Sequence, residues 1–149
     1  MSLIRITKQF TFETGHALFG YDGLCKNVHG HSYKLSVTVL GTPIQDTHHV
    51  KHGMVIDFKD LKKIVKEEIV DLFDHATVFN QNTPHVELAK TLEKSGHKVI
   101  LVDYQPTSEE MIIDFSKKIK LRLPSNIKLH SLKLQETETS FAEWHASDQ

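Results

Sequence analysis

Two histidines separated by one glycine, His29 and His31, are the first sign of chemistry in this chain. Side chains two positions apart on an extended strand point to the same face, so the two imidazoles can share one metal ion. His16 lies at the end of the preceding predicted strand and joins them if the two strands pair as a hairpin. Three neutral imidazoles suit zinc and leave a fourth coordination position open, which is the usual form of a catalytic zinc site.

An isolated pair of this kind is more often a surface or structural feature than a metal site, and its weight here comes from Cys25, which stands four residues before His29. Cys25 is the only cysteine, so it forms no internal disulfide and is a candidate reactive thiol. A nearby cation or metal lowers the pKa of a thiol and makes a thiolate base available near neutral pH. Two other interpretations stay open: a closed zinc site with Cys25 as its fourth ligand, and an inert buried thiol.

The strands that must position these residues are predicted by alternating apolar side chains over residues 4–12 and 32–40. The histidines and the cysteine lie in the long connection between them, and such connections commonly present reactive groups from a rigid sheet. Further strands are expected over residues 98–104 and 127–134, the last with a bulge near Ser131.

Helical periodicity begins after Asp57, a potential cap, and is expected to end near Leu72 or Phe73. A short helix is expected after Pro84, and a long one over residues 106–123. With the strands, these elements predict an α+β fold, an antiparallel sheet with two main helices packed on one face, in a single domain spanning residues 1–149. Long strand edges modestly favour pairing between subunits.

Composition narrows the classes of partner. The chain is 39% hydrophobic and 25% charged, with a formal net charge of -1. No apolar run is long enough to cross a bilayer, and no net field attracts nucleic acid or anionic lipid. The first residues lack the apolar core of a secretory signal, so a cytoplasmic protein without nucleic-acid or membrane partners is expected.

Six segments, taken in order, resemble one protein family. They are residues 12–16, 29–35, 53–62, 72–75, 106–109 and 135–137. The family is that of 6-pyruvoyltetrahydropterin synthase and its bacterial relative 6-carboxytetrahydropterin synthase, which acts in queuosine (7-deazapurine) biosynthesis, and the resemblance spans nearly the whole chain. The gap of three residues between Cys25 and His29 is similar to that of the 6-carboxy type, because the animal 6-pyruvoyl enzymes have a longer one.

The resemblance implies the tunnelling fold (T-fold), in which subunits join their sheets into a barrel. Two trimers would stack into a homohexamer with active sites at the subunit interfaces. It further implies a zinc-dependent lyase that converts 7,8-dihydroneopterin triphosphate to 6-carboxy-5,6,7,8-tetrahydropterin and releases acetaldehyde and triphosphate. The first alternative is a 6-pyruvoyl-type enzyme that eliminates triphosphate from the same substrate, and the second is a non-catalytic module that binds zinc and a pterin.

The resemblance also implies residue roles. His16, His29 and His31 would hold Zn2+, and Cys25 would move protons. Catalytic roles are also implied for Asp74, His75 and Glu136. Substrate-binding roles are implied for Glu136, Thr107 and Glu109.

Without the resemblance, these last assignments have plainer readings. Asp74 and His75 are then a structural pair at a helix end, and Glu136 is a solvated acid at the end of a strand. Thr107 and Glu109 are equally explained as residues that begin a helix.

Three features depart from the family pattern. Gln105 stands where Asn is commoner, the segment 78–98 is long, and the tail 140–144 lacks the usual aromatic-plus-basic ending. These departures concern selectivity for the tail of the substrate rather than the metal.

Overall fold

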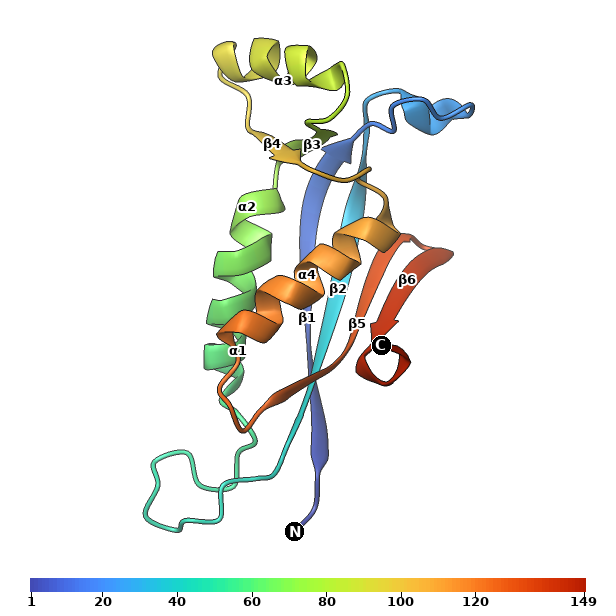
Figure 1. Ribbon diagram of the computed structural model, residues 1–149. Helices are drawn as coiled ribbons and strands as arrows, with labels where there is room; N and C mark the ends of the chain where they lie inside the picture. Colours follow the sequence, from blue (N-terminus) through green and yellow to red (C-terminus); the bar gives the residue numbers. More distant parts are fainter.

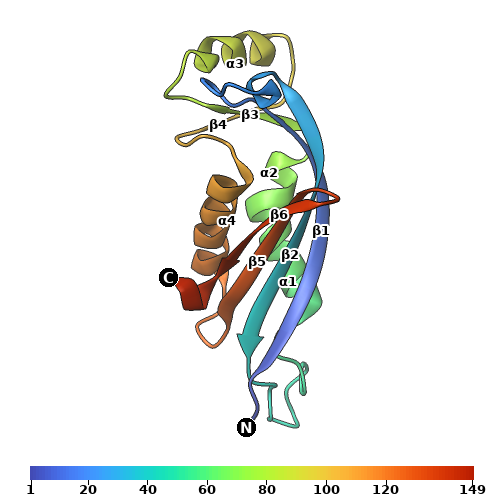
Figure 2. The ribbon, with the colours of Figure 1, turned by 90° about the vertical axis from the view of Figure 1, so that its right-hand side faces the viewer.

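A six-stranded sheet with two long helices against one of its faces forms the body of the protein (Figure 1). This computed structural model describes residues 1–149. Strands β1 (Ile4–His16) and β2 (His29–Gly41) pair as a long antiparallel hairpin at the centre of the sheet order β4-β3-β1-β2-β5-β6. Figure 2 shows that this hairpin is curved, with the helices on its concave side.

The two ends of the sheet differ in strand direction. Beyond β2, strands β5 (Lys128–Thr137) and β6 (Ser140–His145) continue the sheet in antiparallel pairing. Beyond β1, the short strands β3 (Ala76–Asn80) and β4 (Val99–Val102) pair in parallel. The predicted α+β class is confirmed, and the sheet is mixed because these two short strands run alongside β1.

Alternation along the central hairpin separates a core face from an open face. Phe12 and Tyr33 are directly opposite each other, buried and stacked with ring centroids 5.6 Å apart. On the other face most opposing pairs are polar, as in the hydroxyl contact between Thr7 and Thr38. Both strands extend past the predicted ranges, to His16 and from His29, because ladder pairing continues where glycines interrupt the apolar alternation.

One continuous helix follows the cap at Asp57, whose carboxylate accepts a hydrogen bond from the Lys59 amide at 2.9 Å. It comprises α1 (Phe58–Val65), a π-helical turn (Lys66–Val70) and α2 (Asp71–Phe73). Its end at Phe73 confirms the predicted boundary. Buried side chains from successive turns, Leu61, Val65 and Ile69, face the sheet.

The second long helix, α4 (Ser108–Arg122), covers β5 and β6. Thr107 caps it by accepting a hydrogen bond from the Glu110 amide at 3.2 Å. Helix α3 (His85–Lys94) lies against β3 and β4 at the end of the molecule opposite the N-terminus (Figure 1). Short 3-10 turns occupy Leu24–Lys26 and Ala146–Asp148.

The predicted bulge near Ser131 is confirmed, because the register between β2 and β5 shifts from Ser131 to Leu129 and leaves His130 as the extra residue. Strands β3 and β6 were not predicted. Each has at most six residues and little room for a period-two pattern, so neighbouring strands decide their conformation. No helix is long and apolar enough to span a membrane.

Phe115 joins the helices to the hairpin and is the best probe of this core. It is fully buried on α4, with its ring edge-on to Phe12 and Phe73. We expect Phe115→Ala to lower the free energy of unfolding by about 3–5 kcal/mol, measured by denaturant unfolding, because it removes a large side chain and leaves a cavity. Leu121→Ala on the same helix, at a position 88% exposed, is the control and should change stability by less than about 0.5 kcal/mol. Equal losses in the two variants would contradict this assignment of the core.

Candidate metal centre and active site

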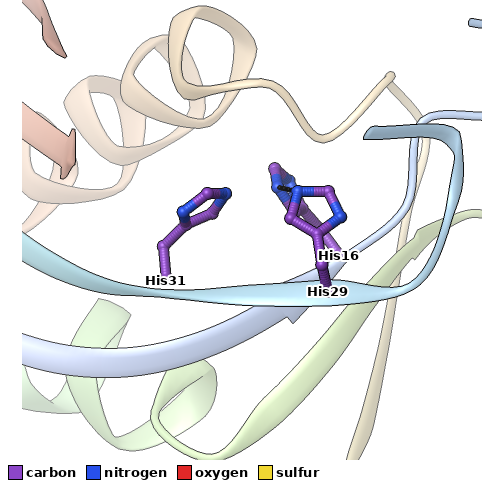
Figure 3. A group of neighbouring side chains, drawn as sticks. All are labelled: His16, His29 and His31. Atoms are coloured by element: carbon purple, nitrogen blue, oxygen red, sulfur yellow. Dashed lines mark hydrogen bonds between the residues drawn. The ribbon is translucent and has the colours of Figure 1, made fainter. Parts of the chain in front are cut away.

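The three histidines lie together at one end of the central hairpin (Figure 3). The register places His16 directly opposite His29, and Thr14 opposite His31. His31 is therefore the diagonal neighbour of His16 on the face that carries the core. One donor nitrogen from each ring can be chosen so that all three lie within 4.8 Å of one another. The arrangement predicted from the spacing of the histidines is present in the structure.

Backbone carbonyls orient two of these rings. The Nδ1 atom of His16 lies 2.6 Å from the carbonyl oxygen of Pro106, and Nδ1 of His29 lies 2.6 Å from the carbonyl oxygen of Asn27. A carbonyl only accepts hydrogen bonds, so each Nδ1 carries the proton and each Nε2 presents a lone pair. Histidines that bind metals commonly donate a hydrogen bond from their other ring nitrogen in this way.

The two Nε2 atoms of His16 and His29 face each other at 3.0 Å. Two lone pairs at this distance repel unless a proton or a cation lies between them. The Nε2 atom of His31 is buried, has no hydrogen-bond partner, and lies 3.4 Å from a carboxylate oxygen of Glu136. Unpaired buried nitrogens of this kind fit a bound cation, and the donor set of three imidazoles suits a zinc-like ion.

Burial favours the neutral form of two of these rings, which is the form that binds a metal. His16 is 2% exposed, and burial lowers its pKa from 6.5, with the hydrogen bond to the Pro106 carbonyl acting in the opposite direction. Burial also lowers the pKa of His31, while the negative charge of Glu136 opposes this effect. Both imidazoles are therefore more readily deprotonated than a solvated histidine.

A cavity of about 330 Å3 opens beside the histidines, and five of the site residues expected from the sequence line it: His16, Cys25, Thr107, Glu109 and Glu136. Cys25 sits on the 3-10 turn Leu24–Lys26, which is tied down by a 3.0 Å hydrogen bond from the Leu18 amide to the Cys25 carbonyl. The group of mutually close donor atoms consists of the three histidines and does not include Cys25. This geometry favours an open three-histidine site over the closed site in which Cys25 is a fourth ligand.

Glu136 reaches the cavity from β5 and is held by a residue that sequence reasoning missed. The hydroxyl of Ser108 donates a hydrogen bond to one carboxylate oxygen of Glu136 at 2.5 Å, and Ser108 is buried. The sequence signal that could have identified Ser108 is its position directly after the helix cap Thr107. The carbonyls of Asn27 and Pro106 were also missed, because every residue type carries a carbonyl and the sequence does not mark these two.

Asp74 and His75 lie elsewhere. They follow α2, with Nδ1 of His75 3.0 Å from a carboxylate oxygen of Asp74 and the His75 side chain 78% exposed. His75 lines a separate polar depression of about 320 Å3 with Glu13 and Ser32, which point away from the core face of the hairpin. Hydrogen bonding from the Glu13 amide is the main cause that lowers the pKa of Asp74. A single chain does not bring this pair into the cavity that holds Cys25.

Comparison with known proteins identifies the family of this chain. Residues 5–147 match the family described as 6-pyruvoyl tetrahydropterin synthase. The chain belongs to this family. It is 38% identical over 143 residues to 6-carboxy-5,6,7,8-tetrahydropterin synthase of Haemophilus influenzae, covering 95% of this chain and 99% of the relative.

Solved structures support the fold. The 6-pyruvoyl tetrahydropterin synthase of Caenorhabditis elegans is similar with a TM-score of 0.68 and 25% identity, over 98% of this chain and 97% of that one. An uncharacterized protein of Wolinella succinogenes has a TM-score of 0.80 at 21% identity, over 98% and 99% of the two chains. The resemblance stated from the motifs and the tunnelling fold that it implied are both confirmed.

We expect the protein to bind about one zinc ion per chain, because three imidazoles form one open site. His16→Ala and His29→Ala should each reduce bound zinc to below about a tenth of an equivalent under the same dialysis, measured by elemental analysis. His48→Ala, in an exposed loop, is the matched control and should retain full zinc. Stoichiometric zinc in both site variants would show that the metal is held elsewhere.

Proposed function

We propose that this chain is a zinc-dependent 6-carboxy-5,6,7,8-tetrahydropterin synthase. Its reaction would convert 7,8-dihydroneopterin triphosphate to 6-carboxytetrahydropterin with release of acetaldehyde and triphosphate, as a lyase in queuosine biosynthesis. The observation that carries the proposal is the single cavity lined by His16, Cys25 and Glu136, next to the other two histidines. The name of the Haemophilus influenzae relative supports the choice of product.

The three histidines would hold zinc through His16 Nε2, His29 Nε2 and a ring nitrogen of His31. A zinc ion bound there supplies Lewis-acid chemistry for hydroxyl and carbonyl oxygens of the substrate side chain. Cys25 lines the same cavity and has no other cysteine with which to pair, so its thiolate is the proposed proton acceptor. The carbonyls of Asn27 and Pro106 keep the rings of His29 and His16 in the ligating tautomer.

Glu136 is the proposed anchor for the pterin ring. A carboxylate accepts two hydrogen bonds in one plane and matches the adjacent amino and N–H groups of a pterin. Ser108 orients one of its oxygens by hydrogen bonding, while the other faces His31. Thr107 and Glu109 border the same cavity from the start of α4 and are the proposed secondary contacts.

Asp74 and His75 are proposed to complete the active site of a second copy of the chain. Their exposure and their location in a separate depression leave them available to a neighbour rather than to Cys25 of the same chain. In a homohexamer built as a dimer of trimers, each interface would combine this pair with the cavity of another subunit.

The alternative is a 6-pyruvoyltetrahydropterin synthase, which would eliminate triphosphate from the same substrate. The names of the family and of the Caenorhabditis elegans structure favour it. The second alternative, a non-catalytic module that binds zinc and a pterin, would leave the substrate unchanged.

Mass spectrometry of the products separates these functions. Zinc-loaded protein given 7,8-dihydroneopterin triphosphate is expected to yield 6-carboxytetrahydropterin and acetaldehyde. Cys25→Ala should reduce turnover by at least about a hundredfold while keeping its zinc, because a general base contributes on this scale. A pyruvoyl product would move the assignment to the alternative synthase. No turnover by zinc-loaded wild-type oligomer would support the binding module.

Pterin binding tests the role of Glu136. Glu136→Gln keeps the size of the side chain but replaces one acceptor oxygen with a donor, so we expect the dissociation constant for neopterin to rise by about tenfold or more. Fluorescence titration of the pterin measures this change. Glu143→Gln on β6, which does not line the cavity, is the matched control. Equal affinities for both variants and the wild type would remove Glu136 from the binding site.

A further inference from the structure

The long segment between β3 and β4 ends at a lysine that contacts the Asp74–His75 pair. The side-chain amine of Lys98 donates hydrogen bonds to the carbonyl of Asp71 at 2.7 Å and to the carbonyl of Asp74 at 2.8 Å. These carbonyls lie in the last turn of α2 and immediately after it. A cation at this end of a helix satisfies carbonyls that have no partner within the helix and opposes the negative end of its dipole.

The backbone at the pair is strained. His75 is the one residue other than glycine with a positive φ, at 61°. This conformation is uncommon for a side chain with a β-carbon, and it persists only where surrounding contacts impose it. Contacts from neighbouring segments must therefore hold the backbone of His75 in this conformation.

Strand β1 supplies the first set of contacts. The amide of His75 donates to the Glu13 carbonyl at 2.6 Å, and the amide of Glu13 donates to a carboxylate oxygen of Asp74 at 2.9 Å. The hydroxyl of Thr14 donates to the Phe73 carbonyl at 2.9 Å. These three bonds fix the turn to the hairpin on one side only.

Lys98 supplies the other side, and its own position is fixed by the sheet. The amide of Thr77 donates to the Lys98 carbonyl at 3.1 Å, and the next residue, Val99, begins β4 opposite Thr77. The segment that departs from the family pattern thus ends at Lys98, directly before the strand that fixes its position, and the amine of Lys98 binds the carbonyls at the end of α2.

We propose that Lys98 is a positioning residue for Asp74 and His75, and that the segment from α3 to β4 holds this pair in its active conformation. The inference rests on the proposed function, since it takes the pair to be catalytic. Lys98 acts through the Asp71 and Asp74 carbonyls and does not itself contact the cavity that holds Cys25.

The test compares Lys98→Met with Lys98→Arg in the zinc-loaded protein. Lys98→Met removes both hydrogen bonds and should lower kcat on the order of tenfold with KM unchanged, because misplacement of a catalytic group slows the reaction without weakening binding. Lys98→Arg keeps the donors and should restore kcat to within about threefold of wild type. Lys94→Met, on the exposed last turn of α3, is the matched control and should behave as wild type.

Amide hydrogen exchange gives a readout that is independent of turnover. The amides of Asp74 and His75 should exchange faster in Lys98→Met than in wild type, and at the wild-type rate in Lys98→Arg. Unchanged exchange and unchanged kcat in Lys98→Met would overturn the inference, as would a rise in KM alone. If Lys98→Met does not fold, the Arg variant and Lys98→Gln, which keeps one donor group, decide the question by the same two readouts.

His75→Ala separates this inference from the proposed function. An inactive His75→Ala beside a fully active Lys98→Met would refute the positioning role and leave the synthase assignment intact. Wild-type kcat in His75→Ala would show that the pair is not catalytic, and the positioning role would then fall with it. Loss of activity in His75→Ala, with a partial loss in Lys98→Met that arginine restores, is the expected result.

Discussion

Pairing between β1 and β2 is the constraint on which the candidate site depends. Side chains alternate across a sheet with a period of two, so a slip of one residue would move His16 to the opposite face from His29. The same alternation buries Phe12 and Tyr33 two to four residues further along the hairpin. The core therefore locks the register of the hairpin, and the register in turn sets the geometry of the histidines.

Polar atoms buried at the end of the core lose their hydrogen bonds to water, and two of them gain no hydrogen bond within the chain in return. Both the Nε2 atom of His31 and the hydroxyl of Tyr33 are buried without a hydrogen-bond partner. Burial is the main cause that raises the pKa of Tyr33, and the nearby Glu136 adds to it. Unpaired polar atoms are rare in folded proteins and commonly mark a site that a ligand or ion completes. Their concentration beside the three imidazoles fits the metal centre proposed here.

The end of β1 connects the two parts of the proposed active site. Its core face carries His16, while the backbone of Glu13 holds the Asp74–His75 turn on the other side. Thr14 lies between them and ties its strand to the end of α2. One strand end thus presents His16, a proposed metal ligand, to its own cavity and supports the Asp74–His75 pair, which faces outward. This arrangement fits the proposal that two subunits share one active site.

The sequence by itself determined the elements with long, consistent periods and the residues whose chemistry is intrinsic. The caps at Asp57 and Thr107 marked both long helices, and the spacing of His29 and His31 required a shared face, because these are properties of local backbone geometry. Only the tertiary structure decided the conformation of β3 and β6, which are too short to carry a pattern of their own. It alone brought the carbonyl of Pro106 to His16, 90 positions away, and placed the Asp74–His75 turn away from Cys25. Such contacts depend on how distant segments pack, and nothing in the local sequence encodes them.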